Sequence, residues 1–273
     1  MFSLLKTEWL KIRKYPAFWL LIGLCILSYP GINYIFLNMY ESIVKKENAA
    51  GKMIGMFLGD PFTFPEIWRT SAYLTSVFVF IPAVLVIMLV TNEYTYKTNR
   101  QNIIDGWSRR DFMVAKLIDV ILIVLMITFL YAGVAYFIGT TNTAGKTVNH
   151  WSLAYYIALF ALQTFSQLSL AFLVGLVVRK SFIALAIFMF YSIVAEPIAV
   201  NLLRYKYFKN DIGRFFPLEL SDRIIPPPAF MSRFDEKAYQ GALDAVNNHI
   251  VYTLILVLIT WGINYLVYLK RDL

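Results

Sequence analysis

The sequence predicts an all-α integral membrane protein, and three features of its composition support this fold class. Of its 273 residues, 59% are hydrophobic and only 15% are charged, whereas soluble domains carry about a quarter charged residues. The mean hydropathy is +0.61. Aromatic residues make up 17% of the chain, as is typical of proteins that anchor many helix ends at membrane surfaces. This much apolar surface cannot be buried in one core, so part of it is expected to face lipid.

Six stretches are long and apolar enough to cross a bilayer, which requires roughly 20 residues in an α-helix. With an N-terminal interfacial helix and a structured external segment, they are expected to form a single transmembrane domain over residues 1–273. Prolines within or at the ends of these stretches are tolerated where neighbouring helices satisfy the freed carbonyls. The expected spans are residues 16–37, 71–91, 117–139, 152–178, 181–200 and 250–269.

The distribution of Lys and Arg predicts the orientation, because short loops rich in these residues stay in the cytoplasm. Six spans place both termini on one side. Basic residues are dense in the segments expected on that side, and acids nearly balance them in the other loops. Both termini are therefore predicted to be cytoplasmic, in a multi-pass protein of the cell membrane. The net charge of +8 is expected to attract anionic lipid headgroups, not nucleic acid.

Two segments outside the spans have structure of their own. Residues 1–15 are predicted to form an interfacial helix, because apolar residues recur at helical spacing over 2–14 while the basic residues lie elsewhere. Residues 201–249 are too rich in apolar and aromatic residues for a flexible linker. They are expected to fold back against the outer membrane face, with a short helix near 235–248.

No catalytic or metal-binding motif is recognisable. Residues 145–147 read GKT, but a phosphate-binding loop needs a glycine five positions before Gly145, and Thr140 stands there. Cys25 is the single cysteine, and His150 and His249 are far apart in sequence. The chain is therefore predicted not to be an enzyme, to bind no metal and to carry no cofactor.

Two acids lie within expected spans. Asp119 stands near the start of the third span, where the helix dipole stabilises a carboxylate, so a structural role is favoured. Glu196, near the outer end of the fifth span, is more unusual because a carboxylate at depth usually faces a partner or a cavity. Pairing with Arg204 is the structural explanation, and lining the exit of a translocation path is the functional alternative.

The segment at 92–116 has the strongest signal of function. A short amphipathic helix is expected at about 97–105, then a turn at Gly106, and then a new helix capped by Ser108 with Asp111 three residues later. A solvated basic loop would need no such turn chemistry. The mixture of apolar, aromatic and basic residues is typical of a docking surface.

This segment resembles the first cytoplasmic loop of ABC type-2 exporter permeases, whose pattern is an acid, a T-x-R-like step, a small-residue turn followed by S-R, and a closing Lys. The six spans and the segment before the last one are similar too, although no fused ATPase is present. The residues that carry the resemblance are Glu93, Thr98, Arg100, Gly106, Trp107, Ser108, Arg109 and Lys116 in the loop, and Glu8, Trp9 and Lys11 in the interfacial helix. Ile103 and Ile104, on the face of the expected 97–105 helix, are further candidate docking residues.

The resemblance implies a membrane subunit that works as a homodimer, or as a heterodimer with a similar permease. A separate cytoplasmic ATP-binding subunit would bind ATP and Mg²⁺ and push on the loop, which acts as the coupling loop. Substrate would pass along a path lined by the second and fifth spans. The candidate path residues are Thr75, Ser76, Phe78, Tyr191 and Glu196.

Two other classes of function fit the sequence less well. A secondary transporter or channel would be expected to show paired inverted halves, and no internal repeat is visible. A membrane-embedded enzyme would need a nucleophile–base or metal constellation. The substrate class stays open, because apolar and hydroxyl side chains suit lipids, peptides and hydrophobic drugs equally.

Overall fold

The computed structural model describes residues 10, 13–44, 55, 58–98, 101, 104, 106, 108–143, 147–203 and 211–270. Over these residues every regular element is a helix. In chain order they are α2 (Pro16–Val44), α4 (Ile67–Ser76), α5 (Phe80–Thr95), α7 (Arg109–Asn142), α8 (Tyr156–Val178), α9 (Ser181–Phe190), the π-helical η1 (Tyr191–Ala195), α10 (Glu196–Leu202), the 3₁₀ turn η3 (Asp211–Phe215), α11 (Pro217–Asp222), the 3₁₀ turn η4 (Ala229–Arg233) and α12 (Glu236–Lys270).

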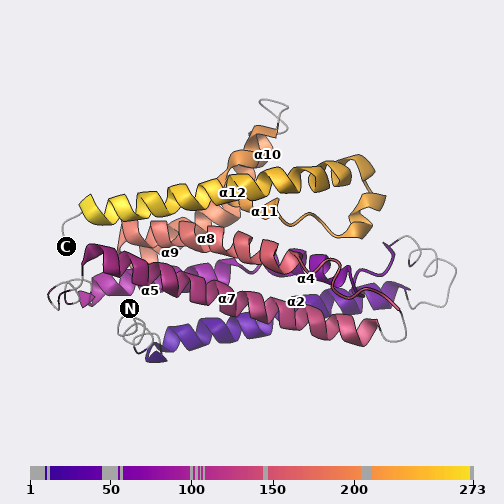
Figure 1. The fold of residues 1–273 in the computed structure, drawn as a ribbon, viewed down its shortest axis with the longest axis horizontal. Coiled ribbons are helices and arrows are strands. Elements are labelled where there is room, and N and C mark those ends of the chain that lie inside the picture. The colour runs from indigo at the N-terminus through magenta and orange to yellow at the C-terminus, as the bar shows by residue number, and fades with distance from the viewer. Residues whose placement is uncertain are drawn as a thin grey trace.

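The long helices lie side by side in one elongated bundle (Figure 1). The start of α2, the end of α5, the start of α7 and the end of α12 all lie at one end of it, which we call the loop end. Helix α8 is the centre of the packing, because it contacts α4, α5, α7, α9, α11 and α12. Its polar face is buried against these neighbours: Gln163, Thr164, Ser166, Gln167 and Ser169 are each at most 8% exposed.

The helices confirm the predicted fold class. Five of them, with α9, η1 and α10 counted as one, are each long and apolar enough to cross a membrane. The pair α4 and α5 passes the same test together, with a bend of 50° between them, so the described helices provide five spans, or six if this pair crosses as one. Large apolar side chains point outward from the bundle, among them Leu27 (73% exposed) and Phe129 (75%). Such a surface suits lipid and not water.

The fifth span is irregular, and its proline explains why. Pro197 has no N–H and its ring would clash with the carbonyl four residues earlier in an α-helix. The π-helical turn η1 lies directly before it, at Tyr191–Ala195, and such a turn shifts the hydrogen-bond ladder by one residue. Beyond it, α10 rises away from the other helices (Figure 1).

The segment at 201–249 differs from the prediction in two ways. The short helix expected at 235–248 is the first part of α12, which continues without a break from Glu236 to Lys270. Asp235 begins it, since its Oδ1 accepts the N–H of Ala238 at 2.9 Å. In addition, α11 does not lie on a surface but packs between α8, α10 and α12. Residues 204–210 lie outside the described residues.

At the end opposite the loop end, aromatic side chains fix the start of α4. The Nε1–H of Trp68 donates to the carbonyl of His150 at 2.8 Å, and the Tyr131 hydroxyl donates to the carbonyl of Trp68 at 2.6 Å. The ring of Phe64 lies so close to α7 that a Cβ added at Gly139 would come within 2.6 Å of it. Only glycine permits this approach.

Candidate functional site

The predicted docking loop is anchored in the bundle by a buried ion pair. Glu93 stands in the last turn of α5 and Lys116 in the second turn of α7, and the two side chains are each 5% exposed. Nζ of Lys116 lies 2.8 Å from Oε1 of Glu93. The ion pair therefore joins the helix that enters the loop to the helix that leaves it.

Two further residues complete this pair. The Thr98 hydroxyl donates to Oε2 of Glu93 at 2.7 Å, so both carboxylate oxygens are used. Oδ2 of Asp119 lies 3.3 Å from the Lys116 ammonium. The interaction explains why Asp119 is tolerated within a span, since buried charges persist only when paired. We call Glu93, Thr98, Lys116 and Asp119 the loop root.

The end of the loop next to α7 is held by a helix cap and a glycine turn, both of which the sequence predicted. Ser108 and Asp111 form a capping box at the start of α7. Gly106 has φ of +97°, which a residue with a side chain rarely adopts. The Arg109 guanidinium donates to the carbonyl of Leu269 near the end of α12.

Between these fixed points the loop exposes an apolar side chain. Ile104 is 81% exposed, and in the sequence it lies between Thr98 and Lys116 of the loop root. Arg100, Ile103 and the interfacial-helix residues Glu8, Trp9 and Lys11 lie outside the described residues, so their predicted roles stay predictions.

A second feature lies midway along the bundle, where residues of α4, α5, α8, η1, α10 and α11 line a cavity of about 360 Å³. Unlike the lipid-facing surface, its wall carries many polar side chains. We call it the acidic cavity, because three carboxylates line it: Glu196, Glu219 and Asp222. The other polar side chains on its wall are Ser76, Gln167, Ser192 and Asn201.

The predicted path residues divide between this cavity and the packing around it. Ser76 and Glu196 line the acidic cavity. Thr75 does not, because it is 1% exposed and its hydroxyl donates to the carbonyl of Ser71 within α4. Phe78, at the bend between α4 and α5, packs on the ring of Phe80. Tyr191 is half-buried in η1, outside the cavity wall but beside the Glu196 carboxylate.

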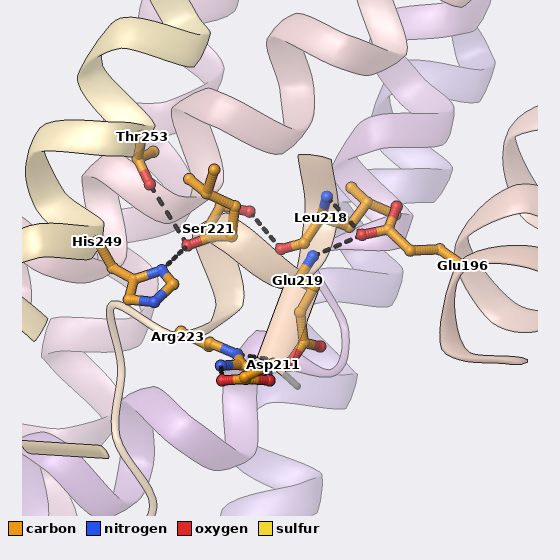
Figure 2. A network of polar contacts seen from close by, with 9 residues as sticks. Glu196, Asp211, Leu218, Glu219, Ser221, Arg223, His249 and Thr253 are labelled. Atoms are coloured by element: carbon orange, nitrogen blue, oxygen red, sulfur yellow. Dashed lines mark hydrogen bonds and ion pairs between the residues drawn. The ribbon is translucent and has the colours of Figure 1, made fainter. Parts of the chain in front are cut away.

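Glu196 is tied to backbone rather than to a cation. Its Oε1 accepts the N–H of Leu218 at 2.8 Å and that of Glu219 at 2.6 Å (Figure 2). These N–H groups belong to the first turn of α11, where no partner exists within the helix. The preceding residue, Phe216, has no side-chain acceptor, so Glu196 caps α11 from another helix. Arg204, the partner expected from the sequence, lies outside the described residues.

The same short helix is held to α12 on its other side. The carbonyl of Leu220 accepts from Nδ1 of His249 at 3.2 Å and from the Thr253 hydroxyl at 3.5 Å (Figure 2). Because a carbonyl oxygen only accepts, Nδ1 of His249 carries the proton. Arg223 donates to Glu219 and to Asp211, which ties η3 to α11.

Comparison with protein families identifies the chain. The model of a family described as "ABC-2 family transporter protein" matches residues 4–195, which is more than half of the sequence. The chain belongs to this ABC-2 family. No curated protein matches the sequence. The match ends at Ala195, so Glu196 and α11 follow the matched region directly.

Several residues of this ABC-2 transporter protein escaped the sequence analysis. Asp222 was not singled out, yet its Oδ1 accepts the side-chain amides of Gln163 and Gln167, each at 2.6 Å. The polar face of α8 was a signal that a partner exists, but nothing in the sequence indicated which residue it is. Glu219 was missed because nothing in the sequence indicated that it lies beside Glu196 and Asp222.

The carboxylates that the structure of this ABC-2 protein describes are not arranged as a metal site. Among the residues that the structure describes, no three His, Cys, Asp or Glu side chains are arranged to hold a metal ion. The chemistry open to the acidic cavity is therefore hydrogen bonding and charge attraction.

Proposed function

We propose that this ABC-2 transporter protein is the membrane subunit of an exporter that a separate ATP-binding subunit drives. The family assigns a transporter membrane domain, and the loop at 92–116 is the candidate docking surface. The observation that carries the proposal is the Glu93–Lys116 ion pair at 2.8 Å. A force applied to a loop anchored in this way is transmitted to α5 and α7 together, whereas an unanchored loop would deform without moving these helices.

The orientation and the nucleotide follow from the same proposal. The loop end, where α2 begins and α12 ends, faces the cytoplasm, and the protein spans the cell membrane. ATP and Mg²⁺ bind to the partner subunit, and this chain binds neither. Exposed Ile104 (81%) is the apolar contact for the partner, since docking surfaces are built around a few apolar anchors within a polar rim.

Transport requires a path, and α4, α5 and α10 supply one side of it. We propose that a second copy of this chain, or a similar permease, supplies the other side. Closure of the ATP-binding subunits would move α5 through the loop root. The movement would change the width of the acidic cavity, because Ser76 and Phe80 form its wall on either side of the α4–α5 bend.

The test is co-purification with an ATP-binding subunit encoded beside this protein's gene, followed by ATPase assay in liposomes. Ile104→Glu is expected to lower the stimulated ATPase rate by about tenfold or more, as truncation of a central anchor costs about 2 kcal/mol. Val148→Glu is the matched control, since it places the same charge at the opposite end of the bundle on an exposed position.

Two outcomes would contradict the proposal. If the chain retains no ATP-binding subunit and stimulates none, it is not driven in this way, and a secondary transporter or channel becomes the better interpretation. If Ile104→Glu and Val148→Glu keep the same stimulated rate, the partner does not dock on the 92–116 loop.

A further inference from the structure

Among the residues that the structure describes, the acidic cavity carries more negative charge than its neighbours neutralise. No described Lys or Arg side chain forms part of its wall. Of its three carboxylates, only Glu219 is paired with a cation in the described part of the chain, through the Arg223 Nε–H at 2.7 Å. That cation is shared with Asp211. Asp222 is bonded to two neutral amides and Glu196 to two backbone N–H groups.

Asp222 faces the cavity from deep within the protein. It is enclosed between α8 and α11, and its two amide partners are buried, Gln163 at 0% and Gln167 at 8% exposure. The Asp222 side chain itself is exposed, because it borders the open space of the cavity. A ligand that enters the cavity can therefore reach this carboxylate.

Glu196 supplies an independent sign of a missing partner. The residue is 2% exposed and lines the cavity. Its Oε1 accepts two hydrogen bonds, but its Oε2 is buried and makes none that meets hydrogen-bond geometry with a described residue, although the Tyr191 phenol lies nearby. Buried carboxylate oxygens without a donor are costly, and such groups often mark a place for a ligand.

These observations favour one class of ligand. The wall offers acceptors with negative charge, and the described carboxylates are not arranged for a metal ion. A volume of about 360 Å³ suits part of a small organic molecule. We propose that the acidic cavity binds the primary amine or guanidinium group of an organic cation through Glu196 and Asp222, and so selects cationic substrates.

The proposal rests on the transport function, because it names the substrate class of the path. It also explains the polar lining on an otherwise apolar bundle. A cation that donates hydrogen bonds gains from charge assistance, whereas a neutral ligand of the same shape leaves the negative charge of Glu196 and Asp222 without a counter-charge. Selection for charge therefore follows from the wall chemistry.

Binding to this chain alone provides the test. The full-length protein is placed in nanodiscs of neutral phosphatidylcholine at about pH 8, above the raised pKa of Asp222. Dansylcadaverine, a fluorescent primary amine, is titrated with fluorescence anisotropy as the readout. N-acetyl-dansylcadaverine, which has the same ring and chain without the charge, is the matched probe. The amine is expected to bind at least about tenfold more tightly than its acetylated form.

The variants Glu196→Gln and Asp222→Asn remove charge and keep the acceptors. In Glu196→Gln the amide oxygen would still accept from Leu218 and Glu219, and in Asp222→Asn it would still accept from the two glutamines, so the fold is expected to persist. Each variant is expected to weaken amine binding about tenfold and to leave the acetylated probe unchanged. Asp244→Asn removes an exposed acid from α12 and is expected to change neither.

Several results would overturn the proposal. Equal affinity for the amine and its acetylated form would mean that the probe binds through apolar contact. Unchanged amine binding in Asp222→Asn would show that the amine does not bind in the acidic cavity. This conclusion would hold even if Glu196→Gln did not fold. The ATPase assay keeps the two proposals distinguishable. If the amine fails to bind while the ATP-binding subunit is still stimulated, the chain is an ATP-driven permease and only the cationic substrate class fails.

Discussion

The Nζ atom of Lys116 lies 2.8 Å from Oε1 of Glu93, although 23 residues separate them. Both groups are buried, so the pair is shielded from water and salt. It closes the base of the loop, and its geometry is independent of the exposed residues between. A partner that binds the loop therefore meets a support held by the bundle itself.

Replacing Lys116 by Met is expected to destabilise the protein strongly. The change removes the Lys116 ammonium from two buried carboxylates, Glu93 and Asp119, and removal of one partner from a buried pair costs about 3–5 kcal/mol. Thermal unfolding in detergent, followed by circular dichroism, measures the effect. Lys180→Met removes an exposed lysine and is expected to change the free energy of unfolding by less than about 0.5 kcal/mol. A loss of equal size in both variants would disprove the role of the loop root.

Two glycines of α7 are expected to respond differently to alanine. A Cβ at Gly139 would lie 2.6 Å from Cζ of buried Phe64, whereas nothing lies within 4 Å of one at Gly133. Gly139→Ala is therefore expected to lower the free energy of unfolding by about 1–3 kcal/mol. Gly133→Ala is expected to raise it by about 0.5 kcal/mol. Chemical denaturation of both variants in one detergent tests the contrast, and a similar effect at the two sites would contradict it.

Stability is expected to depend on pH through Asp222. The protein packed around the Asp222 carboxyl raises its pKa from 3.8 to about 7 even though the side chain borders the open cavity, so the folded state holds a proton that the unfolded chain releases between these values. Stability is then greatest at low pH and falls as the pH rises through about 7. The titratable and charged groups on the surrounding elements are Glu219 and Arg223 of its own segment, Glu196 of α10, Tyr73 of α4 and His249 of α12.

The melting temperature between about pH 5 and pH 8 checks this expectation. Asp222→Asn cannot ionise, so the melting temperature of this variant is expected to fall less over that range than that of the unmodified protein. Asp244→Asn, on the exposed face of α12, serves as the control and should keep the full pH dependence. If Asp222→Asn shows the same slope as the control, Asp222 does not titrate in this range.

The start of α7 is expected to loosen when its cap is removed. The Ser108 hydroxyl accepts the N–H of Asp111 at 3.1 Å, and replacing such a cap by alanine costs about 1 kcal/mol. Hydrogen exchange of the first turn of α7 should therefore become about fivefold faster in Ser108→Ala. Ser152→Ala, an exposed serine outside the helices, should leave that exchange rate unchanged. Protection that persists in Ser108→Ala would contradict the capping role.

Local chemistry made part of the molecule predictable. Ser108 and Asp111 are three residues apart, so the capping box could be read directly from the sequence. The polar residues of α8 share one helical face, which indicated that this face avoids lipid. In both cases the relevant spacing lies within one helix, where the geometry is fixed in advance.

Long-range contacts could not be predicted in this way. Glu196 was noted as unusual, but its partners are backbone N–H groups of Leu218 and Glu219, which have no side-chain signature. The bend between α4 and α5 lies at residues 77–79, just before Pro82, but a proline in an apolar stretch does not by itself tell whether the helix bends or continues. The continuation of α12 through Glu236–Lys270 was missed because polar residues in its first turns resembled a separate surface helix.

The length of helix α12 has a mechanical consequence. It touches α11 at His249 and the loop end at Leu269, which are about 30 Å apart along the helix axis. A helix tilts far more easily than it stretches, so the distance between these two contact points stays nearly constant when α12 moves. We expect a shift of Arg109 that keeps its bond to Leu269 to be passed along α12 to α11, whose residues Leu218, Glu219 and Asp222 line the acidic cavity. The loop end and the middle of the bundle are thus mechanically linked by one unbroken stretch of backbone.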